Sequence, residues 1–140
     1  MCRWVQHDFV FRLSRILMNK EKHKLLLCLG SNFQSEEKVS AAKVLLEANF
    51  SNLRFSDARL TAPLNMQRKT PFLNQLVVAE TDKESTEVRR MLKAMERELG
   101  RTEHSKSEGI IPIDIDLLEW DSEVIHSEII KNKYFADFLF

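Results

Sequence analysis

The sequence predicts an α+β fold, in which an antiparallel β-sheet carries two α-helices on one face. Two observations support this prediction: four segments have the apolar runs or alternation typical of strands, and two have apolar residues at helical spacing. Their order along the chain is strand, helix, strand, strand, helix, strand. With 140 residues, the chain is long enough to bury a core as one domain.

The first half of the chain predicts three strands and one helix. An apolar run from residue 24 ends in a Gly-Ser-Asn turn at residues 30–32, which is typical of a buried strand. Ser35 is expected as the N-cap of a helix, because the apolar residues that follow it recur at helical spacing. Residues 53–60 and 72–79 alternate as strands, and the loop between them contains two prolines.

The second half predicts one helix, one strand and a return strand. A regular apolar stripe favours a helix that begins at an N-cap on Ser85 and ends at Gly100. The polar residues 101–109 lead into the last strand, residues 110–120, whose sequence is IIPIDIDLLEW. A tight turn and short return strand are expected in residues 120–125, as a C-terminal β-hairpin extension. The order of these elements is the ferredoxin-like (βαββαβ) arrangement.

Composition excludes several classes of protein. The 21 Lys and Arg residues balance the 21 Asp and Glu residues, which argues against a nucleic-acid binder. No apolar stretch approaches the ~18 residues of a membrane span. Two cysteines, Cys2 and Cys28, cannot build a disulfide framework, and Cys28 lies in an apolar run where a reduced thiol packs as a small hydrophobe. We therefore expect a cytoplasmic protein.

Residues 1–23 differ from the rest of the chain and are an uncertain basic extension. Six Lys or Arg residues stand against two acidic residues up to residue 24. Two explanations stay open: a weakly amphipathic basic helix at a surface, or upstream sequence before a true start at Met18. The single folded domain is expected to span residues 24–140.

Two aspartates in the last strand are the first candidates for chemistry. Asp114 and Asp116 are two residues apart, so on a strand they share a face while Ile113, Ile115 and Leu117 take the other. Two carboxylates at this spacing repel each other unless a cation lies between them. Mg²⁺ prefers one or two carboxylates together with phosphate oxygens and water. The pair therefore predicts either a magnesium site or a half-exposed acidic strand face.

An asparagine inside the third strand is the second candidate. Asn74 is flanked by apolar residues in the segment FLNQLV. It is either a buried amide with satisfied hydrogen bonds or the group that recognises a heterocycle through paired donor and acceptor bonds. In the second case, a planar ligand would stack on Phe72.

The sequence also resembles the 6-hydroxymethyl-7,8-dihydropterin pyrophosphokinase family over about residues 25–127. The resemblance rests on five short motifs whose order and spacing together are specific. They are LGSN at residues 29–32, TAPL at 61–64, FLN at 72–74, ERELGR at 96–101 and DID at 114–116.

This resemblance implies transfer of pyrophosphate from ATP to the hydroxymethyl group of the pterin, releasing AMP in folate biosynthesis. It implies Mg²⁺, as two ions, and ATP as co-substrate. With it goes the expectation of a monomer whose partners are small molecules, the pterin and ATP. By resemblance, the site residues are Arg101, Asp114 and Asp116 for catalysis, with both aspartates as metal ligands; Glu96, Arg101, Leu117 and Tyr134 for the nucleotide; and Thr61, Leu64, Phe72 and Asn74 for the pterin.

The sequence departs from the family's pattern just before the aspartates. An Arg-Trp-Gly-Pro-Arg-Thr type run is usual there, whereas residues 107–112 read SEGIIP. One hypothesis is that Arg68 and Lys69, with Arg101, replace the missing arginines; the alternative is that Arg68 and Lys69 form a solvated loop tip. The departure also leaves open a catalytically weakened relative that binds a pterin or nucleotide as a sensor or partner subunit, and a ferredoxin-like interaction module without a ligand.

Overall fold

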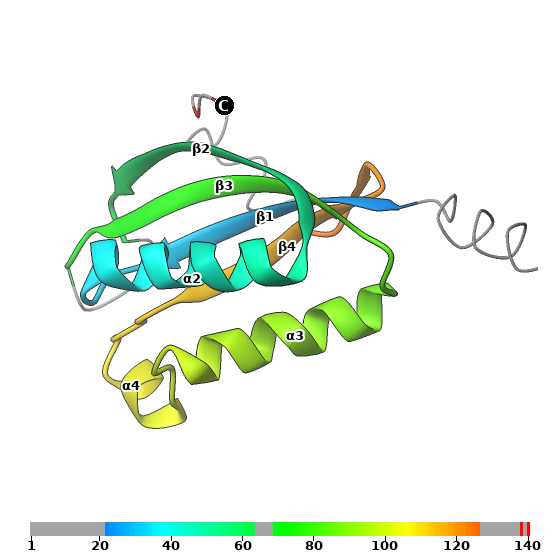
Figure 1. Ribbon diagram of the computed structural model, residues 1–140. Helices are drawn as coiled ribbons and strands as arrows, with labels where there is room; N and C mark the ends of the chain where they lie inside the picture. Colours follow the sequence, from blue (N-terminus) through cyan, green and yellow to red (C-terminus); the bar gives the residue numbers. More distant parts are fainter. Residues whose placement is uncertain (1–21, 64–68, 127–137, 139) are drawn as a thin grey trace, which may run out of the picture.

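The computed structural model describes residues 22–63, 69–126, 138 and 140. The strands are β1 (His23–Ser31), β2 (Ser51–Thr61), β3 (Phe72–Thr81), β4 (Asp114–Trp120) and β5 (Glu123–Val124), and the helices are α2 (Ser35–Asn49), α3 (Ser85–Glu98) and α4 (Glu103–Ser107). Within these residues, the strands form one antiparallel sheet in the order β2-β3-β1-β4-β5. Figure 1 shows α2 and α3 side by side on one face of this sheet. The predicted α+β class is therefore confirmed.

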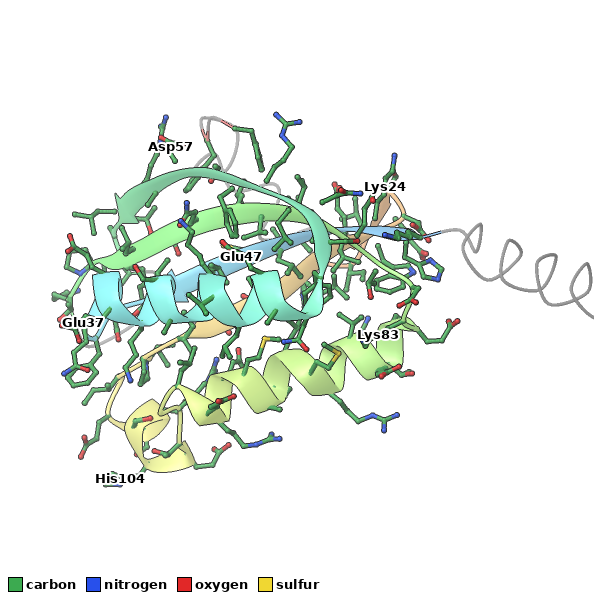
Figure 2. The ribbon with its side chains drawn as sticks, viewed as in Figure 1. Lys24, Glu37, Glu47, Asp57, Lys83 and His104 are labelled. Carbon is green, nitrogen blue, oxygen red and sulfur yellow. The ribbon has the colours of Figure 1, made fainter. Side chains whose placement is uncertain are left out.

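The main core lies between the sheet and the two helices. Alternate side chains of the central strands point toward the helices, among them Leu27, Leu29 and Ile115. On the helix side, the stripes that include Leu46 and Leu92 pack against them. Figure 2 shows how side chains fill the space between α2, α3 and the sheet. The sequence places this core correctly because helical and strand periodicities both select the same buried face.

A second, smaller cluster covers the opposite face of the sheet. Cys28, Leu76 and Leu118 come from three adjacent strands, and Phe138 from near the end of the described chain packs on them with an exposure of 7%. The guanidinium of Arg59 lies over the Phe138 ring, 5.6 Å from its centroid. Cys28 is therefore a buried small hydrophobe, as the sequence predicts.

The N-terminal ends of α2 and α3 differ from the sequence predictions. Ser35 and Ser85 are not N-caps but the first helical residues, and the positions before them, Gln34 and Glu84, make no side-chain capping bond. The hydroxyl of Ser35 instead donates to the carbonyl of Ser31 at 2.9 Å. The prediction failed because a serine hydroxyl can bond to either side of a helix start, and local sequence does not decide which.

Two further differences lie between α3 and the aspartates. The polar residues expected as a loop contain the short helix α4, which begins with a reciprocal capping box between Thr102 and Ser105. The last strand, β4, begins at Asp114 rather than at residue 110. The two-residue strand β5 pairs with β4 through Trp120 and Glu123. Among the described helices, none has the length and apolar character needed to cross a bilayer.

Candidate functional site

The register of the central strands aligns the predicted site residues in one row. Gly30 of β1 is paired with Asn74 of β3 on one side and with Asp114 of β4 on the other. Directly paired residues point to the same face of a sheet, and in this row that is the face without helices. The next row along β1 pairs Cys28 with Asp116. The amide and the two carboxylates therefore share one face, with a glycine between Asn74 and Asp114.

Asp114 is held in its ionised form by an arginine from beyond the end of α3. Nη1 of Arg101 donates to Oδ1 of Asp114 at 2.8 Å and to Oε2 of Glu96 at 3.1 Å. Burial acts to raise the pKa of Asp114, but hydrogen bonds with Asp116 and Arg101 outweigh it and hold this pKa below its ordinary value. Asp114 is therefore a ready anionic ligand.

Asp116 behaves in the opposite way, because no arginine or lysine side chain among the described residues forms an ion pair with it. Burial and then the negative charge of Asp114 raise the pKa of Asp116 to about 8. Burial, and then the negative charges of Asp116 and Asp114, also raise the pKa of the neighbouring Cys28 thiol, which stays protonated. At neutral pH, and without a bound cation, the carboxylate pair therefore retains a proton, and a bound cation would displace it.

This raised pKa predicts how stability depends on pH in metal-free buffer. An unfolded aspartate titrates near pH ~3.9, so between about pH 4 and about pH 8 folded Asp116 holds a proton that the unfolded chain has lost. The favourable contribution of protonated Asp116 to the free energy of unfolding is thus complete below pH ~4 and is lost as pH rises to about 8.

We expect Asp116→Asn, which cannot titrate, to gain free energy of unfolding relative to the parent as pH rises from 5 to 8. Urea unfolding of both proteins across this range measures the difference. Stability curves that run parallel would contradict the raised pKa.

The amide of Asn74 is half-buried and has one partner within the described residues. Its Nδ2 donates to the hydroxyl of Thr61, the last residue of β2. The Thr61 backbone is paired with Phe72, so these three predicted pterin residues lie together at one end of the sheet. A Cβ atom on Gly30 would lie 3.0 Å from Oδ1 of Asn74 and 3.8 Å from the Phe72 ring. A glycine at position 30 therefore leaves room for the amide.

This geometry predicts the effect of Gly30→Ala. The backbone of Gly30 is not in the left-handed region, so the new methyl group acts through contact with Asn74. If Asn74 binds a pterin, displacing its amide should weaken binding about tenfold, the effect of losing about one hydrogen bond. Calorimetry with 6-hydroxymethylpterin measures this loss, and binding of an ATP analogue is the control that should not change. Unchanged pterin affinity would show that Asn74 is not the recognition group.

Asn32, the last residue of the LGSN motif, connects the end of β1 to the segment before β4. Its backbone N–H donates to the carbonyl of Ile111 at 3.0 Å, while its side-chain Oδ1 accepts from the Ile111 N–H at 2.7 Å. Its Nδ2 donates to the carbonyl of Gly109 at 2.8 Å. Asn32, only 3% exposed, thus fastens the end of β1 to the segment that leads into the aspartates.

The free edge of β4 borders a small cavity. Within the described residues, no strand pairs with the outer edge of residues 114–117, and α3 packs there instead. A cavity of about 130 Å³ is lined by Asp116 and Leu117 of β4 and by Arg89 and Lys93 of α3. A larger hollow of about 610 Å³ has neither aspartate in its lining.

The structure brings together most, but not all, of the predicted site residues. Arg101, Glu96 and the aspartates form one connected group, and Leu117 lines the adjacent cavity. Leu64, Arg68 and Tyr134 lie outside the described residues, as do residues 1–21. In the part of the chain that the structure describes, no three His, Cys, Asp or Glu side chains gather as a metal site.

Together, the fold and the site define an α+β domain in which an amide and a carboxylate pair lie side by side on one sheet face. A family model for 7,8-dihydro-6-hydroxymethylpterin-pyrophosphokinase matches residues 26–140. The chain belongs to this family.

Curated relatives agree with this membership. The chain is 36% identical over 100 residues to the 2-amino-4-hydroxy-6-hydroxymethyldihydropteridine pyrophosphokinase of two Porphyromonas gingivalis strains, covering 66% of this chain and 65% of each relative. It is 28% identical over 119 residues to the mitochondrial folate synthesis bifunctional protein of Pisum sativum, covering 84% of this chain and 23% of that protein. The chain thus spans about two thirds of the length of the bacterial relatives and a smaller part of the plant protein.

Proposed function

We propose that the protein transfers pyrophosphate from ATP to the hydroxymethyl group of 6-hydroxymethyl-7,8-dihydropterin, giving AMP, in folate biosynthesis. The observation that supports this most is the row of Asn74, Gly30 and Asp114 across three adjacent strands. This row places the Asn74 amide, which suits the edge of a heterocycle, near the Asp114 carboxylate, which suits a cation that binds phosphates. Family membership and the names of the relatives support the same reaction.

The pterin is proposed to bind at the end of β2 and β3. Asn74 would hydrogen-bond to the polar edge of the ring, held in place by the Thr61 hydroxyl. Phe72, which is half-buried, offers a stacking face. Leu64 completes the set by resemblance.

The aspartates fit Mg²⁺, and we propose that they hold two ions. Asp114 and Asp116 supply hard oxygen ligands, and a site of only two carboxylates suits a metal that keeps waters and phosphate oxygens in its shell. When bound, Mg²⁺ would neutralise the triphosphate. The protein's own part is to keep Asp114 ionised through Arg101 and to hold both carboxylates on one face of β4.

ATP is proposed to lie along the free edge of β4, with its base at the small cavity by Leu117. Arg101, which bonds to Asp114 at the start of β4, is the proposed phosphate contact, with Tyr134 added by resemblance. In the reaction, the pterin hydroxyl oxygen bonds to the β-phosphorus and releases its proton to solvent. The bond from that phosphorus to the α,β-bridging oxygen breaks, and AMP leaves.

Three broader assignments belong to the same proposal. The order β2-β3-β1-β4, with α2 and α3 on one face, supports a ferredoxin-like (βαββαβ) core to which β5 is added. Residues 24–140 are assigned to this domain, and the protein is assigned as a cytoplasmic monomer.

A second candidate function has one observation in its favour. Residues 107–112, which run from the end of α4 toward β4, include no arginine or lysine. A cation on a loop can contribute a factor of ~10³ to 10⁵ in phosphoryl chemistry, so its loss favours a relative that binds pterin or nucleotide with little turnover. Such a protein would act as a sensor or a partner subunit.

Calorimetry tests the proposed site. Purified protein is titrated with 6-hydroxymethylpterin and with a non-hydrolysable ATP analogue, each with and without Mg²⁺. We expect the analogue to bind only with Mg²⁺, and the pterin to bind more tightly once the analogue is present. Binding of neither ligand would rule out the proposed function.

A further inference from the structure

We propose that Glu96 is a positioning residue, which holds the guanidinium of Arg101 beside Asp114 and touches no ligand itself. This inference rests on the function proposed above and changes one part of it. The resemblance places Glu96 among the nucleotide contacts, whereas its surroundings in the structure suit a fixed anchor.

Both carboxylate oxygens of Glu96 are buried and already have partners within the protein. The residue is 2% exposed, although α3 is otherwise polar on its outer face. Its Oε2 accepts from the N–H of Ile115 at 2.8 Å and from Nη1 of Arg101 at 3.1 Å. Its Oε1 accepts from Nζ of Lys93 at 3.3 Å. A ribose hydroxyl could reach this carboxylate only by displacing one of these partners.

The bond to Ile115 fixes Glu96 to the strand that carries the aspartates. Ile115 lies between Asp114 and Asp116, and its N–H points to the edge of β4 that no described strand covers. A buried N–H without a partner is costly, so this bond stabilises both the carboxylate and the strand. Glu96 therefore links α3 to β4 at the position of the carboxylate pair.

A backbone hydrogen bond at the end of α3 also joins Arg101 to Glu96. The N–H of Arg101 donates to the carbonyl of Glu96 at 3.0 Å, and the N–H of Gly100 to the carbonyl of Arg97 at 3.1 Å. With φ of +104° at Gly100, this is a Schellman motif, and it turns the chain back toward β4. Arg101 thus depends on Glu96 through both backbone and side chain.

Arg101 bonds to two carboxylates, those of Glu96 and Asp114, which differ in their exposure to solvent. The Glu96 side chain is 3% exposed and fixed, whereas the Asp114 side chain is 33% exposed and belongs to the proposed metal ligands. If Asp114 exchanges Arg101 for a cation, Arg101 keeps Glu96 as its partner and stays at the site. Its remaining N–H groups can then face the phosphates.

A double-mutant cycle separates this role from direct contact. Glu96→Gln, Arg101→Met and the double variant are titrated with a non-hydrolysable ATP analogue and Mg²⁺, and thermal unfolding confirms that each is folded. In the parent background, we expect Glu96→Gln to weaken binding of the analogue about tenfold, the effect of losing one charge-assisted hydrogen bond. When Arg101 is already methionine, the same change should weaken binding less than about twofold. Glu98→Gln, two residues along α3 and exposed, is the matched control and should bind like the parent.

Two results would overturn the role of Glu96. An equal loss in both backgrounds would mean that Glu96 contacts the nucleotide itself or acts only through the strand. No loss in the parent background would mean that Arg101 needs no anchor. Should Glu96→Gln not fold, Glu96→Asp takes its place, because it keeps the charge but is too short to bond to Ile115 and Arg101 together.

The same samples keep this inference distinct from the proposed function. If the parent binds the analogue but forms no AMP with pterin and MgATP, the proposed reaction fails while the cycle still decides the role of Glu96. If the parent does not bind the analogue with Mg²⁺, both are overturned.

Discussion

Replacing either Asp114 or Asp116 by asparagine is expected to abolish magnesium-dependent ATP binding and to lower AMP formation by about 10³-fold or more. Asparagine keeps the shape of the side chain but removes a negative charge, and losing a metal's charge stabilisation costs about 4 kcal/mol, or about three powers of ten in rate. Because burial and the charge of Asp114 disfavour ionised Asp116 without a cation, Asp116→Asn should not lose stability in metal-free buffer. Asp114→Asn also gives up the ion pair with Arg101, so thermal unfolding must confirm that this variant is folded.

The measurement is calorimetry of the ATP analogue with and without Mg²⁺, together with an AMP assay. Glu119→Gln is the matched control, because Glu119 lies on the same strand, beyond the proposed site. We expect it to bind and turn over like the parent. If both aspartate variants bound the analogue with Mg²⁺ as the parent does, the metal assignment would be wrong.

Replacing Asn74 by leucine is expected to lower affinity for 6-hydroxymethylpterin by about a hundredfold, with ATP-analogue binding preserved. The amide offers paired donor and acceptor bonds, and losing both costs about 3 kcal/mol. Leucine suits a strand and has the same branching at Cγ, so the fold should hold. Calorimetry with each ligand separately measures both affinities.

The Asn74–Thr61 bond allows a control for this result. Thr61→Val removes the partner hydroxyl but leaves the amide in place, so pterin affinity should fall less than in Asn74→Leu. Should Asn74→Leu unfold the protein, with normal pterin binding in the folded fraction, Asn74 would be a structural amide only.

The sequence predicts the sheet and helices well because their signals are local. The stripe through Val88, Leu92 and Met95 is regular enough to define α3 without any tertiary information. The alternation around Asp114 and Asp116 likewise shows that both carboxylates share a face, and Ile115 between them is buried in the core. Periodicity therefore identifies the face on which the proposed site lies.

The parts that sequence does not predict depend on partners distant in the chain. From the sequence alone, Glu96 resembles any other solvated charge on a helix. It is buried because its carboxylate accepts a hydrogen bond from the N–H of Ile115, which is 19 residues away on β4. Asn32 similarly finds its partners 77 and 79 residues later. Helix α4 was missed for another reason, since a five-residue helix has too few turns to show a period and depends on its capping box.

The identity of the nucleotide product tests the central proposal most directly. Purified protein is incubated with 6-hydroxymethyl-7,8-dihydropterin and MgATP, and nucleotides and pterins are separated by chromatography and mass spectrometry. Pyrophosphoryl transfer predicts AMP and pterin pyrophosphate in equal amounts, both absent when Asp114 is replaced by asparagine. ADP with a phosphorylated pterin, or binding of both ligands with neither product, would contradict the proposal.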